Sequence, residues 1–268
     1  MNRFRGWMKL LSLLTLCVLA LYSVNSHADS ISGVVGSKHD LSASGNSNFS
    51  FDTTEVCVFC HTPHGANKNV RADTTEPRTG TVTSGSGSPL LLWNRNLSNA
   101  TSFLPYVSST MTNAGGINNI KVYSLLCLSC HDGVGALNVL TAYPRDGGTL
   151  IPISGYTRIG DLTYLPGMPD PNIGGRTPTN GQSYINLSDD HPISIDYPIS
   201  DSSFQTSAYV TTNGIRLYPN GSGQNISIEC TSCHDVHNEG DSANVNGTFP
   251  FLRVTMKNST LCLTCHIK

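Results

Sequence analysis

Eight of the nine cysteines are arranged as four CxxC pairs, and a histidine follows each pair directly. The two intervening residues place both sulfurs of a pair on one turn of the chain. Thioether bonds from such a pair to the vinyl groups of a porphyrin leave the next residue under the iron, where histidine is an axial ligand. The sequence therefore predicts four covalently bound haem c groups. The motifs are Cys57, Cys60 and His61; Cys127, Cys130 and His131; Cys230, Cys233 and His234; and Cys262, Cys265 and His266.

Zinc ribbons and thiol redox sites are the alternatives, because repeated CxxC pairs also have metal-ligand spacing. Histidine makes up only 9 of the 268 residues. Its occurrence after all four pairs by chance has odds of roughly one in a million, and zinc ribbons do not require it. The motif therefore favours haem attachment.

Four further histidines, His39, His64, His191 and His237, match the number of second axial ligands that four irons need. A lone histidine is more often a surface or polar-network residue than a ligand. The equal numbers and the repeated placement nevertheless favour bis-histidine ligation of all four irons. The rival ligands are the thioethers of Met111, Met168 and Met256, and none of them occupies a repeated position.

Spacing restricts how these ligands are shared. His64 follows His61 by three residues, so it cannot reach the opposite face of the haem that His61 holds and must serve another iron. The simplest scheme pairs residues within each half of the chain: His61 with His39, His131 with His64, His234 with His191, and His266 with His237. The competing scheme donates His64 to a haem of a second subunit.

A repeat organises the sequence that must position these groups. Each half has a leading histidine, then CxxCHxxH, then LCLxCH, which predicts two dihaem modules, residues 29–148 and 149–268, joined near Pro144 to Pro152. Short helices are expected over 120–130 and 259–266, and strands over 184–187 and 226–229. With 38% hydrophobic residues and many turn formers, we expect a mostly irregular, loop-rich fold in which the haems form the core.

The N-terminus has the pattern of a secretory signal peptide. Three basic residues precede an apolar run from Leu10 to Val24, and small residues lead to a predicted cleavage after Ala28. Residues 1–28 would then be removed, with His27 and with Cys17, whose surroundings argue against lipidation. No other segment approaches the roughly 20 apolar residues of a membrane span. The remaining 240 residues carry 13 basic and 18 acidic side chains, a net charge of −5 that argues against nucleic acid as a partner.

Several stretches resemble known multihaem c-type cytochromes with paired CxxCH motifs. They are the HDVH that begins at His234, the Phe251-Leu252-Arg253 segment and the LCLTCH ending. KHDLS, CVFCHTPHG and DHPISIDY are similar to the OmcE-like tetrahaem outer-surface filament cytochromes of metal-reducing bacteria. This resemblance implies an extended, loop-rich fold, a continuous chain of haems, and assembly of subunits into conductive filaments outside the cell.

Three functions follow from these patterns. The first is an electron conduit in extracellular respiration, with redox partner cytochromes as donors, extracellular electron acceptors and further copies of the chain as partners. The second is a nitrite- or hydroxylamine-type haem oxidoreductase, which needs an iron with an open axial position, whereas the histidine count fills every iron and no CxxCK motif is present. The third is a periplasmic shuttle, although about 60 residues per haem is more peptide than such densely packed proteins use. The sequence therefore predicts an electron-transfer protein at the outer cell surface, with the periplasm as the alternative location.

Overall fold

All described residues fall within the unit Ile31–Lys268. The computed structural model describes residues 33–45, 51–71, 90–97, 103–111, 120–132, 137, 139–142, 185–219, 226–238 and 251–268. The predicted signal peptide and module joint lie outside these ranges, as do His27 and Met168. Within the ranges, no helix is long and apolar enough to cross a membrane.

Helix α2 (Val122–His131) carries the second CxxCH motif at its C-terminal end. Its ten residues include no Gly or Pro, and Leu125, Leu126 and Leu128 are buried. The helix ends where the Asp132 backbone N–H donates to the Leu128 carbonyl. The helix predicted over 120–130 is therefore present, beginning two residues later and ending one residue later.

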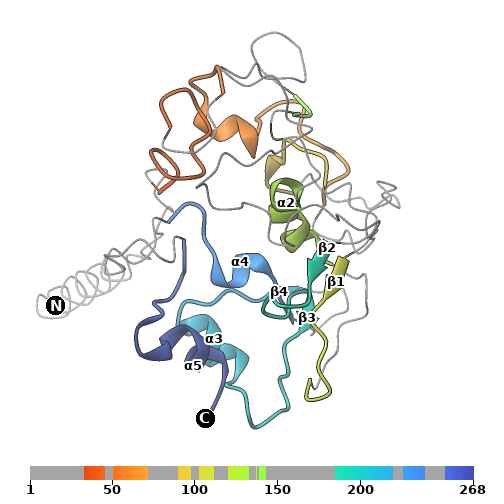
Figure 1. Cartoon of the computed structure of the whole chain (residues 1–268), viewed down its shortest axis with the longest axis vertical. Coiled ribbons are helices and arrows are strands. Elements are labelled where there is room, and N and C mark those ends of the chain that lie inside the picture. Colours follow the sequence, from red (N-terminus) through yellow and green to blue (C-terminus); the bar gives the residue numbers. More distant parts are fainter. Residues whose placement is uncertain are drawn as a thin grey trace, which may run out of the picture. The chain divides into compact units, whose positions relative to one another are not determined.

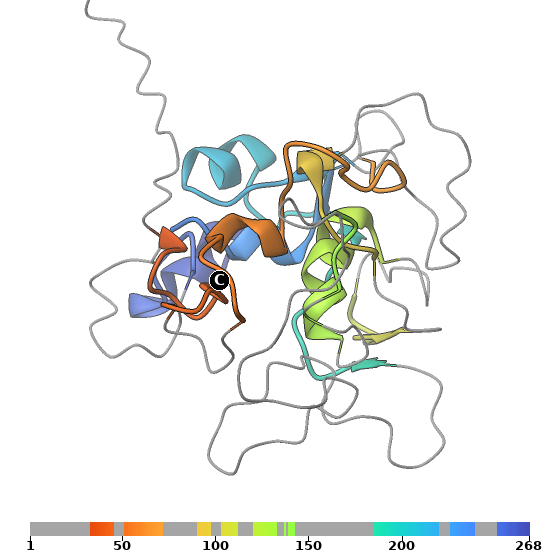
Figure 2. The same ribbon diagram turned by 90° about the horizontal axis from the view of Figure 1, so that it is seen from above.

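The other three motifs lie in shorter turns. The first is in the 3-10 turn η2 (Val56–Phe59) and the third in α4 (Cys230–Cys233). The fourth is in α5 (Thr260–Cys265), which follows the 3-10 turn η4 (Lys257–Ser259) and corresponds to the helix predicted over 259–266. In Figure 1 and Figure 2, α4 lies beside α2, and the two helices are in contact.

Two small sheets connect distant segments of the chain. Strand β1 (Phe103–Pro105) pairs in parallel with β2 (Ile185–Leu187). The second sheet is antiparallel in the order β3-β5-β4, with β3 (Ile195–Asp196), β5 (Ile226–Ile228) and β4 (Tyr218–Pro219). Strands β2 and β5 are the two predicted from sequence. Only Glu229 separates the end of β5 from the start of α4, so the sheet fixes where the third motif begins.

Two further short elements complete the described part. The 3-10 turn η3 (Leu90–Leu92) precedes Trp93. Helix α3 (Ser207–Thr212) begins after Thr206, whose side chain accepts a hydrogen bond from the Tyr209 backbone N–H, and it packs against α5. Sequence periodicity does not predict either element.

Four small clusters of buried apolar side chains replace a single large core in the described residues. Three of them also contact cysteines of the CxxCH motifs: the first contacts Cys60 and Cys130, the third Cys60, and the fourth Cys265. The clusters are Phe51, Val58, Phe59, Leu137 and Leu140; Phe103, Ile120, Leu125, Leu128 and Leu187; Val70, Trp93, Val122 and Leu126; and Tyr197, Val210, Ile215 and Ile228. The apolar packing is therefore arranged around the CxxC turns.

Asn94 joins three segments near the first motif through a fully buried amide. Its Nδ2 donates to the carbonyls of Val58 (2.7 Å) and Ala142 (2.8 Å), and its Oδ1 accepts from the Ala142 N–H (2.8 Å). Its own backbone N–H donates to the Cys60 carbonyl at 2.8 Å. These bonds fasten residues 139–142 to the first CxxCH turn.

We expect Asn94→Ala to lower the free energy of unfolding by about 2–4 kcal/mol, because it leaves buried backbone groups without hydrogen-bond partners. Chemical denaturation of the mature protein measures this. Asn69→Ala is the control, because Asn69 is exposed and its loss should change stability by less than about 0.5 kcal/mol. Equal effects of the two substitutions would contradict the role assigned to Asn94.

Candidate functional site

In three of the four motifs, the histidine backbone N–H donates to the carbonyl of the first cysteine. The N···O distances are 2.9 Å from His61 to Cys57, 3.1 Å from His234 to Cys230, and 2.9 Å from His266 to Cys262. In the remaining motif, His131 is the last residue of α2. Each motif therefore contains one helical turn, in which residues three apart share a face. The two thiols of each pair can then face one side, with the imidazole next to them.

The same three histidines also form isolated antiparallel bridges to bulky residues. His61 pairs with Trp93, His234 with Leu252, and His266 with Phe204. Ring contacts accompany two of these bridges: the centroids of His61 and Trp93 are 5.7 Å apart, and those of His266 and Phe204 are 4.7 Å apart. Each bridge holds the backbone of its histidine in place, and its apolar partner covers one side of the site. The local pattern does not mark Trp93 and Phe204 as partners, whereas Leu252 belongs to the Phe251-Leu252-Arg253 segment that carries the resemblance.

Consecutive CxxC pairs lie next to one another in space, in the order of the chain. Burial raises the pKa of Cys60 to about 12, and the nearby Cys130 thiol is the second cause. The Cys127 and Cys230 thiols are near enough to interact, which raises the pKa of Cys127 and lowers that of Cys230. The four motifs therefore form one series, even though Cys130 and Cys230 are 100 positions apart in the sequence.

The third and fourth motifs are the last neighbours in this series. Burial, followed by the nearby Cys265 thiol, raises the pKa of Cys233 to about 11, and burial raises that of Cys265 to about 11 as well. Thiols with such pKa values are protonated near neutral pH, whereas the reactive thiol of a redox motif has a lowered pKa, as Cys230 does here. None of the eight cysteines in the described ranges is in a disulfide.

The imidazole of His39 faces that of His131. Their ring centroids are 5.9 Å apart with an angle of 62° between the planes, and Phe251 packs edge-on against His39 at 4.6 Å. Burial, with smaller contributions from His131 and His234, lowers the pKa of His39 to about 4, so its ring is neutral at neutral pH. Its Nδ1 is buried and has no hydrogen-bond partner among the described residues. A neutral, buried imidazole of this kind is suited to bind a metal.

The imidazole of His61 faces that of His237 from the other half of the chain. Their centroids are 6.1 Å apart and their planes are nearly parallel, at 22°. The Nδ1 of His61 lies 2.5 Å from the Leu91 carbonyl, which can only accept, so this nitrogen carries the proton and Nε2 is the nitrogen with a free lone pair. The Nδ1 of His237 lies 3.8 Å from Asp235 Oδ1, which leaves its Nε2 on the far side of the ring.

His191 and His266 are also neighbours. Burial lowers the pKa of His266, and the nearby His191 is the next cause. The Nδ1 of His191 is 2.9 Å from the Pro192 carbonyl, an acceptor that again leaves Nε2 with the free lone pair. His64 is exposed, and its backbone carbonyl accepts from the Thr62 hydroxyl at 2.8 Å.

These neighbours differ from the pairs that the simplest sequence scheme expects. The scheme places His39 opposite His61 and His64 opposite His131, whereas the structure brings His39 to His131 and His61 to His237. It also brings His191 to His266. Two of the observed pairs, His39 with His131 and His191 with His266, still lie within one half of the chain, but with a different partner from the one expected. Only His61 and His237 belong to different halves.

The segments that carry the resemblance to multihaem cytochromes come together in the structure. The Asp235 carboxylate is buried, accepts from Arg253 Nη1 at 2.7 Å, and accepts from the His237 N–H at 3.1 Å. The backbone from Phe251 to Arg253 runs along the third motif: the Asp235 N–H donates to the Phe251 carbonyl, and the Arg253 N–H to the Cys233 carbonyl. Asp235 thus fixes the backbone of the turn that leads to His237.

The rival ligands do not occupy comparable positions. Met111 follows β1 in a loop, and Met256 directly precedes η4. In the described ranges, no group of three or more His, Cys, Asp or Glu side chains converges as a site for a bare metal ion. A haem iron takes only two protein ligands, so this finding does not bear on the haem prediction. Compared with protein-family models and with curated proteins, the chain gives no match.

Proposed function

We propose that this chain is an exported tetrahaem c-type cytochrome that conducts electrons in extracellular respiration. The observation that supports it best is the spatial series of the four CxxCH motifs in chain order. Four haems attached to this series would lie next to one another and provide a continuous path for electrons. The proposed role is electron transfer and not catalysis, because eight histidines supply two ligands to each of four irons.

The spacing of two imidazole pairs agrees with a six-coordinate iron. Two metal–imidazole bonds of about 2 Å each, and roughly 1 Å from each nitrogen to its ring centre, place the centroids of a bis-histidine pair about 6 Å apart. The centroid distances of 5.9 Å for His39 and His131 and 6.1 Å for His61 and His237 agree with this spacing. The carbonyls that accept from Nδ1 of His61 and His191 keep Nε2 available for the iron.

We therefore assign axial pairs from these neighbours. His39 and His131 would hold the second haem, His61 and His237 the first, and His191 and His266 the fourth, which leaves the third with His234 and with His64 of a neighbouring subunit. Each haem, when bound, supplies an iron that alternates between the ferric and ferrous states. The chain's own residues would fix the spacing of the irons and hold Nδ1 of His61 and His191 through backbone carbonyls.

Four covalent haems, all low-spin, are the first expected result. The intact mass of the mature protein should exceed that of the peptide by four haems, and EPR of the oxidised form should lack a high-spin signal, because each iron has two imidazoles. Zinc in place of haem, or a persistent high-spin haem that binds nitrite or cyanide rapidly, would contradict the proposal. The latter would favour the oxidoreductase alternative.

A second experiment separates the two pairing schemes. In the assignment above, His237 ligates the haem at Cys57 and Cys60, whereas in the scheme based on sequence modules it ligates the haem at Cys262 and Cys265. In a Cys262→Ala/Cys265→Ala protein, which lacks the fourth haem, we expect His237→Ala to create one high-spin haem by EPR. In a Cys57→Ala/Cys60→Ala protein it should create none. The opposite pair of results would restore the within-module scheme.

We further propose that the protein forms filaments in which His64 ligates a haem of the next subunit. His64 is exposed, and its imidazole has no hydrogen bond or ring contact with the described residues. The observed neighbours give His131 a different partner, His39. The competing scheme, with His64 on the second haem of its own chain, therefore lacks its expected contact. An iron bond between subunits would couple assembly to haem loading and extend the series of haems from copy to copy.

The third prediction concerns this contact. We expect His64→Ala protein to remain monomeric by negative-stain microscopy and to contain one high-spin haem, because the subunit can no longer supply the missing ligand. Added imidazole should restore the low-spin spectrum without restoring filaments, since it fills the iron but does not connect subunits. Filaments formed by the His64→Ala protein would show that His64 does not join subunits.

A further inference from the structure

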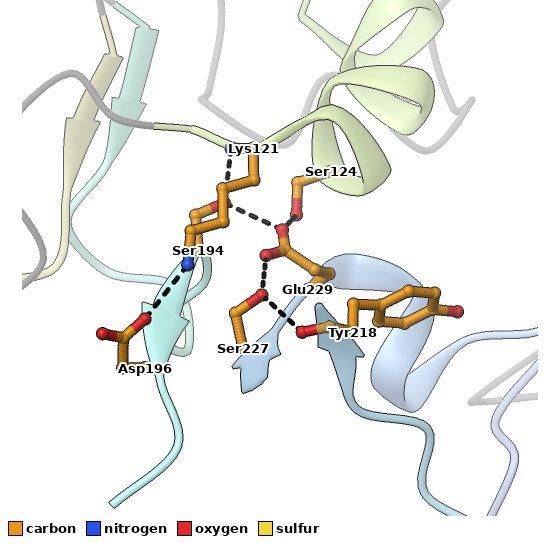
Figure 3. Close-up of polar contacts among 7 residues, drawn as sticks. All are labelled: Lys121, Ser124, Ser194, Asp196, Tyr218, Ser227 and Glu229. Carbon is orange, nitrogen blue, oxygen red and sulfur yellow. Dashed lines mark hydrogen bonds and ion pairs between the residues drawn. The ribbon is translucent and has the colours of Figure 1, made fainter. Parts of the chain in front are cut away.

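A buried carboxylate lies where the two halves of the chain meet. Glu229 precedes the third CxxC pair and is 1% exposed. Its Oε2 accepts from the hydroxyls of Ser124 at 2.6 Å and Ser194 at 2.8 Å, and its Oε1 accepts from the hydroxyl of Ser227 at 2.6 Å. Figure 3 shows the three hydroxyls converging on this carboxylate from α2, from the residue before β3 and from β5. The bonds offset the cost of burying the group.

Besides the carboxylate, each of these hydroxyls contacts one backbone group. Ser124 Oγ accepts from the Cys230 N–H at 3.1 Å, and Ser194 Oγ accepts from the Lys121 N–H at 2.9 Å. Ser227 Oγ lies 3.4 Å from the Tyr218 carbonyl. The carboxylate and its three serines therefore connect the start of α2, the β3-β5-β4 sheet and the start of α4 in one hydrogen-bond network.

The charges around Glu229 come from these same elements. Burial raises the pKa of Glu229 and is the largest effect. Lys121, at the start of α2, lowers this pKa but does not cancel the rise. The Lys121 ammonium itself lies 3.2 Å from Asp196 on β3. Tyr123 on α2 and Cys230 on α4 also lie within range of the carboxylate's charge. Apart from Lys121, no cation in the described ranges contributes to the pKa of Glu229, so the serine hydroxyls are its main partners.

The network lies directly beside the contact between the second and third motifs. Ser124 is three residues before Cys127 and therefore on the same face of α2. Glu229 is the residue before Cys230, and α2, which carries Cys127, is in contact with α4, which begins at Cys230. The bond from Ser124 to Glu229 spans 105 positions in the sequence. It therefore holds together two motifs that the chain itself does not keep close.

We propose that Glu229 is a positioning residue that, through Ser124, fixes the second and third haems against each other and so sets the electron step between the two halves of the chain. This inference rests on the proposed function. Neither residue is assigned as a haem ligand. Their effect is on the distance and angle between the segments that carry Cys127 and Cys230.

Circular dichroism of the Soret band tests this role, because neighbouring porphyrins couple and give paired bands of opposite sign whose size depends on their distance and angle. We expect Ser124→Ala to reduce the paired bands in the fully loaded protein. Thr53→Ala is the control: Thr53 is also buried, but its hydroxyl oxygen accepts from the Glu55 N–H at 3.1 Å, outside this network and outside the CxxCH motifs. It should alter stability without altering the paired bands.

Glu229→Gln provides the conservative variant. Glutamine keeps the shape of the side chain and one oxygen that can still accept the Ser124 hydroxyl, but it lacks the negative charge, so we expect a smaller change of the paired bands than in Ser124→Ala. The Ser124→Ala/Glu229→Gln double variant should lose less stability than the two single changes predict together, since both changes act on the same bond. Four haems by mass and paired bands equal to wild type in Ser124→Ala would overturn the role of Glu229 alone. A wild-type chain without haem mass would overturn the proposed function as well.

Discussion

The hydrogen bond from a histidine N–H to the carbonyl of the cysteine four residues earlier sets the geometry of the candidate site. It closes one helical turn, which directs two thiols and one imidazole from five consecutive residues. The bridges to Trp93, Leu252 and Phe204 then hold three of these histidines in place. Because the turn is local, the sequence predicts it directly, and all four motifs lie in such turns. The haems that would join the thiols remain a proposal.

Which histidine lies next to each turn depends on contacts between distant segments, and a sequence pattern does not specify these contacts. The repeat suggested that each half folds on itself, so His61 was expected to face His39. A repeat specifies similar local structure in both halves, but it does not specify which half lies across from which. The pairing of β1 with β2 and the bond from Ser124 to Glu229 bring the halves together. His61 consequently faces His237.

Among the secondary-structure elements, length and apolar content decided what could be predicted. The segment of α2 is long enough to show its helical character, and β2 and β5 contain alternating Ile, Leu and polar residues. Strands β3 and β4 are two residues long and depend on pairing with β5. The buried groups Asn94 and Glu229 were missed for a different reason. In a chain rich in Asn, Ser and Thr, composition does not indicate which polar side chains become buried.

Buried polar groups have a particular advantage in a protein with small apolar clusters. Apolar packing is non-directional, whereas a buried carboxylate with three hydroxyl donors is satisfied in only one arrangement of the segments around it. A shift of α2 relative to α4 would leave Glu229 or the Cys230 N–H without a hydrogen-bond partner. New contacts between apolar side chains would not compensate for the free energy lost with that bond. If the second and third haems lie at this contact, their separation is fixed by hydrogen-bond geometry. An electron carrier with little core can in this way keep a constant distance between centres that belong to different halves of its chain.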